Sequence, residues 1–177
     1  MALPLDQQQV RNIQLVFQMA KKLQHDIAVL EKYRNEKPPR VFVEFCQIRN
    51  RHNDIQGLVY VIQEKMLDLS DLLPPQMSRW LMQAKLKAIG IFVEISLGFV
   101  RNPPLTLTGS LTARDVLENE QKNFSEARTL FNKLLMEQAV DDKLSDQLDR
   151  TLGMIDETIG IIERLLARSR NYLEEFV

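Results

Sequence analysis

Cysteine is almost absent from this chain, which has one, Cys46, among 177 residues. A single cysteine excludes an intramolecular disulfide. No histidine lies at metal-binding spacing from Cys46, so we expect this side chain to be a small core residue. Residues 1–10 lack the basic flank and the apolar core of a secretory signal peptide. Together these features predict a reducing, cytoplasmic environment.

Long apolar runs and an excess of one charge are also missing. The longest apolar run, residues 89–100, is interrupted by Glu94 and Ser96, and its 12 residues fall short of the roughly 20 that a bilayer span needs. We therefore expect no transmembrane segment. The net charge is −1, yet residues 1–101 hold 14 Lys and Arg against 10 Asp and Glu, and residues 102–177 hold 9 against 14. The two parts can attract each other, and neither is basic enough to predict a nucleic-acid partner.

The residue patterns that mark enzyme and metal sites are missing too. The sequence has no phosphate-binding glycine loop, no cluster of metal-ligand residues and no recognisable pairing of a nucleophile with a base. A di-iron site of the ferritin kind requires a glutamate three residues before a histidine, but Lys22 and Arg49 stand at those positions before His25 and His52. We therefore predict no cofactor, no metal and no enzymatic activity.

Three Pro-Pro pairs and long helical patterns define the organisation of the chain. The pairs are Pro38-Pro39, Pro74-Pro75 and Pro103-Pro104, and they separate helical segments because proline lacks the backbone N–H that an inner helical turn requires. Within the segments, apolar residues recur at alternating intervals of three and four, which is typical of one face of a helix. The pattern predicts five helices, over residues 6–35, 41–73, 77–101, 112–139 and 143–176.

Helix lengths and connections predict the fold class. A helix over residues 41–73 would be roughly 50 Å long, which suits an elongated bundle or a coiled coil. Residues 77–101 are apolar around more of the helix circumference and should form the most buried helix. Short connections force consecutive long helices to run antiparallel. We predict an all-α fold, an elongated antiparallel bundle of five long helices, in which residues 1–177 form a single domain.

Two of the predicted helices begin with capping signals. Asp6 precedes the first apolar pattern and is a predicted N-cap. Thr112, with Asp115 three positions later, predicts an N-cap and a variant of the capping box at the start of the fourth helix.

His52 is the one polar residue in the apolar stripe of the second predicted helix. It belongs to the polar stretch 49–54 and occupies a position that faces inward. A buried polar residue at such a position can pair with a neighbouring helix and fix the register of packing, at a cost in stability. The alternatives are a role as phosphoacceptor or ligand-binding residue, and simple partial exposure.

His25 lies two positions after the stripe residue Leu23 and therefore faces outward, where it could accept a phosphoryl group from a partner protein. In helical phosphotransfer domains, a lysine and a small residue, usually glycine, follow the histidine within the next turn. Residues 27–29 after His25 are Ile, Ala and Val, and Gly57 comes one place too late after His52. We expect His25 to be a solvated side chain, with phosphotransfer as the alternative for either histidine.

Two further features leave alternatives open. Glu94 either points outward on the face that it shares with Lys87 or forms a buried pair with an arginine of another helix. In the connection 102–110, Leu105 and Leu107 either contact a partner or close the end of the bundle.

The function predicted from these features is recognition of another protein. Full amphipathic patterning, near-neutral charge and the missing reactive groups indicate a non-enzymatic interaction module, such as an adaptor, a chaperone-like binder or an assembly subunit, that docks partner helices on its own helix faces. The partner could be a second copy in a homodimer, because the stripe within 41–73 can join two molecules as readily as it packs within one. The alternatives are histidine phosphotransfer through His25 or His52, and binding of an apolar ligand along residues 77–101.

Overall fold

The structure, a computed structural model, describes residues 6–104, 107, 110–136 and 142–174. Within these residues it contains five α-helices and no β-strand. This confirms the predicted all-α fold. The helices are α1 (Gln7–Glu36), α2 (Phe42–Asp68), α3 (Gln76–Arg101), α4 (Leu111–Met136) and α5 (Asp142–Glu174).

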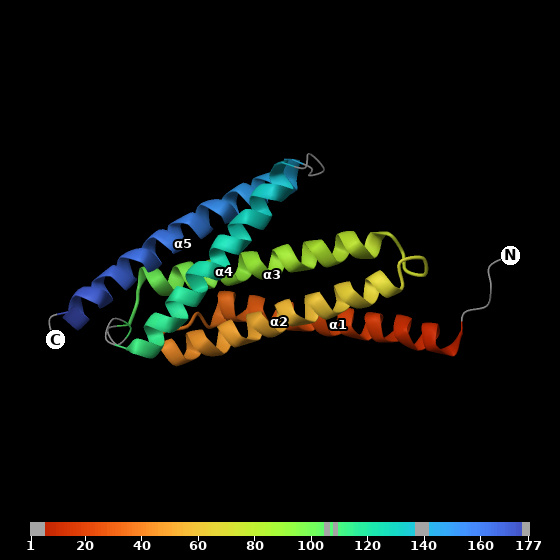
Figure 1. The fold of residues 1–177 in the computed structure, drawn as a ribbon, viewed down its shortest axis with the longest axis horizontal. Helices are drawn as coiled ribbons and strands as arrows, with labels where there is room; N and C mark the ends of the chain where they lie inside the picture. The colour runs from red at the N-terminus through yellow and green to blue at the C-terminus, as the bar shows by residue number, and fades with distance from the viewer. Residues whose placement is uncertain (1–5, 105–106, 108–109, 137–141, 175–177) are drawn as a thin grey trace.

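The helices form an elongated bundle of three, crossed at one part by a helical hairpin (Figure 1). α1 packs against α2 and α3, α2 packs against α3, and α5 packs against both α3 and α4. α4 and α5 lie across the part of the bundle where α3 ends, and they diverge from the other three helices toward the connection between α4 and α5 (Figure 1). The predicted elongated bundle is therefore present, but its five helices do not share one axis.

This arrangement divides the molecule into two regions. We call the region beyond the cover of α4 and α5 the three-helix end, and it comprises the first half of α1 and the continuous segment 59–82 of α2, α3 and their connection. We call the rest of the described chain the five-helix end.

The second helix is shorter than its apolar pattern predicted. α2 ends at Asp68 rather than near residue 73, and the backbone then turns, with the N–H groups of Leu72 and Leu73 both bonded to the carbonyl of Leu69 at 2.9 and 3.1 Å. Leu69 and Leu73 are nevertheless buried in the core. Apolar spacing continued through the turn because the turn also packs inward, so the pattern alone could not reveal where the helix stops.

The two predicted helix caps differ in outcome. Asp6 caps α1 as expected, because its side chain accepts a hydrogen bond from the N–H of Gln9 at 2.7 Å and the Gln9 side chain accepts one from the N–H of Asp6 at 3.0 Å. The predicted cap at Thr112 is wrong. Ser110 caps α4 instead, since its Oγ accepts a hydrogen bond from the N–H of Ala113 at 3.3 Å.

α3 is the central element of the fold. Thirteen of its 26 residues are buried, compared with five of 27 in α2, which confirms the prediction for residues 77–101. At the five-helix end its aromatic rings stack on those of α2 and α4: Phe99 lies 4.5 Å from Phe45, and Phe92 lies 5.9 Å from Phe124, measured between ring centroids. Such ring pairs stabilise a core beyond the area that they bury.

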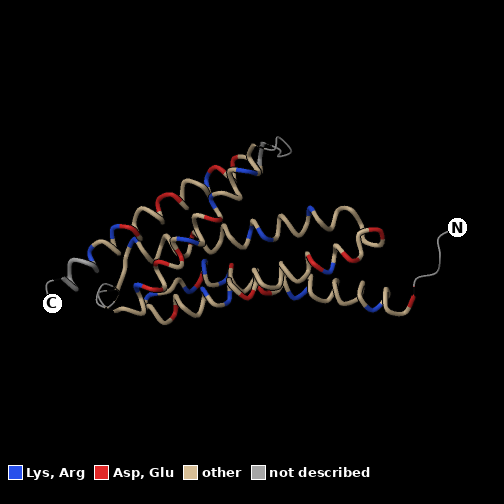
Figure 2. Tube along the Cα trace, viewed as in Figure 1, with Lys and Arg blue, Asp and Glu red and all other residues tan. Residues whose placement is uncertain are grey.

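Charged residues of both signs are distributed along the described helices (Figure 2). Two ion pairs join the basic first part of the sequence to its acidic second part. Arg49 of α2 pairs with Glu120 of α4, and Arg101 of α3 pairs with Glu157 of α5 through two contacts of 2.7 and 2.8 Å. Both pairs tie the α4–α5 hairpin to the bundle, in agreement with the attraction expected from the charge distribution.

Candidate functional site

A buried ion pair marks the junction where α4 crosses the bundle. Glu120 is only 1% exposed, and its Oε1 accepts hydrogen bonds from Arg49 Nε at 2.5 Å and from Asn123 Nδ2 at 3.0 Å. Burial raises the pKa of Glu120, and the bonds from Arg49 and Asn123 oppose that rise. The other carboxylate oxygen, Oε2, has no hydrogen-bond partner among the described residues. α4 is thus held to α2 by a contact that is costly to break.

His52 lies beside this ion pair and contacts two helices. Its ring stacks on Phe92 of α3 at 4.2 Å between centroids, and its Nε2 lies 3.1 Å from the Nε2 of Gln56. Because the amide nitrogen of Gln56 can only donate, the ring nitrogen accepts, which requires an uncharged imidazole. Burial, and then the positive charge of Arg49, lower the pKa of His52 to about 3. The ring therefore acts as a neutral packing surface between α2 and α3.

A cavity of about 390 Å³ opens next to His52, between α2, α3 and α4. Its apolar lining includes Phe92, Phe124 and Leu130, and Gln56 and Lys85 also line it. This cavity marks the place where α4 begins to leave the bundle.

The face of α2 that meets α4 continues beyond this cavity. Arg49, Gln56 and Gln63 of α2 follow one another at intervals of seven residues. Seven residues correspond to almost two full helical turns, so these side chains lie along one face. Gln63 and Ser70 line a second hollow, at the three-helix end.

The face of α3 that meets α4 continues in the same direction. Phe92 and Ile89 line the cavity beside α4, Lys85 lines both hollows, and Met82 and Ser78 line the second one. These five residues follow one another at intervals of three and four, the spacing of one helix face. One interhelical surface thus runs along α2 and α3, covered by α4 at one end and uncovered at the other.

We call the uncovered part of this surface the α2–α3 groove. It encloses about 300 Å³, and its apolar lining includes Val59, Met66, Leu67, Leu81 and Met82. Leu67 is 67% exposed and Met82 is 38% exposed. Lys85 is its only charged lining residue among those described.

A second apolar groove lies on the other side of α3. This α1–α3 groove, about 330 Å³, is lined by Phe17 and Ala20 of α1 and by Met77 and Trp80 of α3, with Lys21 at its edge. Phe17 is 45% exposed. The three-helix end therefore presents apolar hollows on both flanks of α3.

The five-helix end has a hollow of another kind. It measures about 410 Å³ at the connection between α1 and α2, and its lining includes Glu36, Lys37, Arg40 and Glu44. Unlike the two apolar grooves, this hollow is lined by charged side chains of both signs.

The predicted phosphoacceptor candidates differ in their surroundings. His25 is exposed on α1, next to Asp26, whose carboxylate is paired with Lys22. His52 is partly buried against Phe92. The placement of His52 agrees with a polar residue that contacts a neighbouring helix.

The predicted partner-binding leucines do not form an exposed surface in the described chain. Leu107 is 3% exposed and belongs to the core, which corresponds to the alternative that it closes the bundle end. A leucine buried in this way cannot contact a partner without leaving the core. Leu105 lies outside the described residues.

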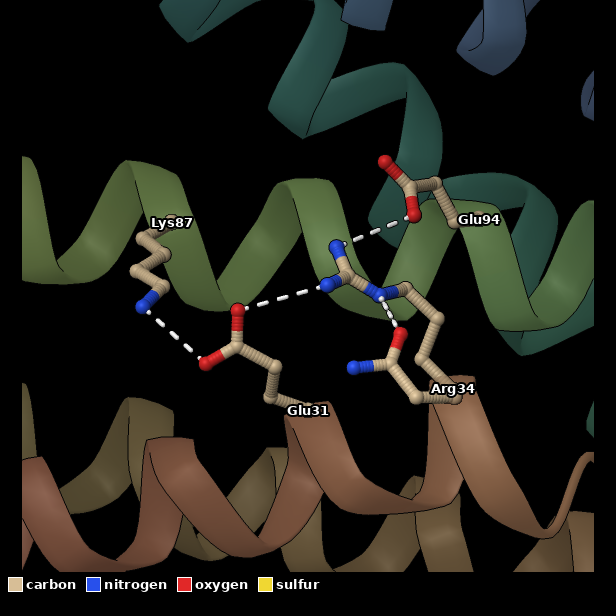
Figure 3. Close-up of polar contacts among 5 residues, drawn as sticks. Glu31, Arg34, Lys87 and Glu94 are labelled. Atoms are coloured by element: carbon tan, nitrogen blue, oxygen red, sulfur yellow. Dashed lines mark hydrogen bonds and ion pairs between the residues drawn. The ribbon is translucent and has the colours of Figure 1, made fainter.

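Glu94 points outward and pairs with α1 (Figure 3). Its Oε2 accepts a hydrogen bond from Arg34 Nη1 at 3.1 Å, while Glu31 of α1 contacts both Arg34 at 3.3 Å and Lys87 of α3 at 3.2 Å. Both alternatives predicted for Glu94 were partly right. Glu94 shares an outward face with Lys87, and it also pairs with an arginine of another helix. This network fixes how α1 lies along α3, on a face away from the α2–α3 groove.

One feature of α4 that points to the junction was missed in the sequence analysis. Glu120 interrupts the inward stripe of α4, Leu117, Glu120, Phe124 and Ala127, at the spacing of a core position. A carboxylate at such a position requires a cation from another helix. Arg49, in the polar stretch around His52, supplies that cation.

Metal and membrane sites find no support in the described residues. Within them, no three or more His, Cys, Asp or Glu side chains come together as a metal site. Cys46 is partly buried, and burial raises the pKa of its thiol. None of the helices that the structure describes combines the length and the hydropathy needed to cross a bilayer.

No protein-family model matches the sequence, no curated protein is detectably similar to it, and no solved structure matches its fold. What the chain binds must therefore be inferred from its own surfaces.

Proposed function

We propose that the protein is a non-enzymatic interaction module that binds a protein partner at its three-helix end. One observation carries this proposal: the surface of α2 and α3 that α4 covers at His52 and Phe92 continues uncovered past Lys85, with Leu67 and Met82 exposed in it. A surface built to pack against a helix, and left open, is a surface for a partner.

The energetics favour occupation of this surface. Burial of a leucine or methionine side chain contributes about 1.5–3 kcal/mol relative to leaving it in water. Leu67 and Met82 are large enough, and exposed enough, for a partner to gain much of that free energy. Methionine is also unbranched and adapts to different partner shapes, which suits Met66 and Met82 as lining residues.

Affinity purification with matched variants tests the proposal. The tagged chain, and a double variant Leu67→Ser with Met82→Ser, are used to capture proteins from a lysate of the source cells. A second double variant, Val43→Ser with Leu111→Ser, serves as the control because these residues are 64% and 66% exposed at the five-helix end.

We expect at least one partner that the wild-type chain and the control variant capture equally and that the Leu67/Met82 variant captures at least tenfold less. Equal capture by all three chains contradicts the proposal. Circular dichroism of each variant verifies that it remains folded.

A second candidate function is binding of a small apolar ligand. The cavity between α2, α3 and α4 measures about 390 Å³, within the range of small-molecule sites, and offers the rings of Phe92 and Phe124 together with the neutral imidazole of His52. Native mass spectrometry of freshly purified protein tests this idea. Added mass that disappears in a Phe124→Ala variant supports a ligand in this cavity, and a spectrum of the bare chain contradicts it.

A further inference from the structure

We infer that the α2–α3 groove receives one amphipathic helix of a partner protein, in contact over two to three turns, with an apolar stripe facing α2 and α3 and a carboxylate opposite Lys85. This inference rests on the proposed function and names the partner of the same surface.

α4 shows what kind of segment this surface accepts. Where it covers α2 and α3, it presents Phe124 to Phe92 and a carboxylate, Glu120, to Arg49. Its inward residues recur at intervals of three and four. The surface that continues into the α2–α3 groove has the same composition, with apolar side chains and one cation, so the same kind of segment fits it.

The two walls of the groove also favour a helix over an extended strand. α2 and α3 are neighbouring helices, and a third helix laid between them packs its side chains into their grooves as in an ordinary helical bundle. An extended peptide would leave its backbone N–H and C=O groups against Leu67, Leu81 and Met82, where apolar side chains supply no hydrogen-bond partner. Helix-in-groove binding avoids this cost because a helix satisfies its own backbone.

The length of the groove sets the length of the occupant. The residues that α2 contributes to the groove lie between Val59 and Leu67, which at about 1.5 Å per residue is about 12 Å. A partner helix of two to three turns spans this distance, with apolar residues at positions i, i+3 or i+4, and i+7.

The charge of the groove favours a partner protein over a second copy of this chain as the occupant. Lys85 is partly buried between the two hollows and makes no ion pair with any residue that the structure describes. A partly buried cation without a counter-charge is unfavourable, and a carboxylate of the partner removes that cost. A second copy docked through the same groove would bring a lining whose only described charge is again Lys85. The occupant that fits therefore carries an acidic residue that this groove lacks.

Selection from a helical peptide library tests the inference on the full chain. The library is displayed on phage, with 16-residue helices on an alanine and glutamine host and random residues at the three stripe positions and the two positions beside them. Selected peptides are synthesised with a fluorophore, and their affinity is measured by fluorescence anisotropy.

We expect enriched peptides to carry three large apolar residues at helical spacing and one Asp or Glu beside them. Met82→Glu should weaken binding at least tenfold, and Leu67→Glu should act in the same direction. Both side chains are exposed, so the fold should tolerate the changes. Phe17→Ser in the α1–α3 groove is the matched control and should leave affinity unchanged.

A charge swap tests the role of Lys85. Lys85→Glu should weaken an acidic peptide about three- to tenfold, and replacing the peptide carboxylate with lysine should restore the affinity for this variant. A loss of affinity that no peptide change restores contradicts the assigned carboxylate.

Four outcomes overturn the inference: no helical peptide is enriched, the enriched peptides lack an apolar stripe, binding is insensitive to Met82→Glu and Leu67→Glu, or sedimentation shows self-association that Met82→Glu abolishes. If the selection fails while the Leu67/Met82 variant still loses a cellular partner, only the helical occupant is wrong. If the peptides bind as described while no cellular partner depends on these residues, the proposed function is wrong.

Discussion

The two ends of this molecule use one interhelical surface in different ways. At the five-helix end, α4 covers α2 and α3 with the Phe92–Phe124 ring contact and the ion pair between Arg49 and Glu120. At the three-helix end, the same faces of α2 and α3 are open and expose Leu67. The comparison indicates that the first region is built for stability and that the second keeps apolar surface available.

The largest difference between the two ends should be in stability. We expect Phe92→Ala to lower the free energy of unfolding by about 3–5 kcal/mol, because it removes a buried ring and leaves a cavity. Leu67→Ala, at the exposed position of the other end, should change it by less than about 0.5 kcal/mol. Urea denaturation of both variants measures the two effects. Equal losses in the free energy of unfolding would contradict the proposed difference between the two ends.

The buried ion pair should have the next largest effect. Glu120→Ala leaves Arg49 partly buried without its counter-charge, and we expect a loss of about 3 kcal/mol in the free energy of unfolding. Glu157→Ala removes the exposed pair with Arg101 and should cost less than about 1 kcal/mol. A double variant, Arg49→Met with Glu120→Leu, should recover most of the loss, since it replaces the pair by apolar side chains.

A pH titration of stability tests the packing of His52 at the five-helix end, with a smaller expected change in the free energy of unfolding. The pKa of His52 is about 3 in the folded chain and 6.5 as its ordinary value, so between these values the unfolded chain binds more protons and stability falls as pH falls. From pH 6.5 to 5 the expected loss is about 2 kcal/mol.

The other ionisable groups at this junction define the control. The raised pKa of Glu120 has the opposite effect to the lowered pKa of His52, because the contribution of Glu120 to stability decreases as pH rises. The titration is therefore done in a Glu120→Gln background, with and without His52→Asn. If His52→Asn leaves the slope between pH 6.5 and 5 unchanged, the assignment of a neutral, packed imidazole is contradicted.

The sequence predicted the elements of this fold better than their arrangement. Apolar spacing and the Pro-Pro pairs located all five helices, because both depend on local backbone chemistry. The end of α2 was placed too late, since Leu69 and Leu73 keep the helical spacing within a buried turn. The oblique path of α4 depends on contacts between distant positions, such as Arg49 with Glu120, which no local pattern contains.

The candidate site was less predictable for the same reason. The α2–α3 groove exists because α2 and α3 lie side by side and α4 does not cover them at the three-helix end. In the sequence, Leu67 and Met82 look like any other apolar residue of an amphipathic helix. Recognition through helix faces could be predicted from the sequence. Which face binds could be inferred only from the structure, which shows where α4 leaves α3.

Methyl NMR of the methionine side chains tests the central claim most directly. Met66 and Met82 line the α2–α3 groove, whereas Met77 lines the α1–α3 groove and Met154 lies on α5. On addition of a peptide from the helical library, we expect the methyl resonances of Met66 and Met82 to shift and those of Met77 and Met154 to stay unchanged. Shifts confined to Met77 or Met154 would show that the open surface of α2 and α3 is not where this protein binds.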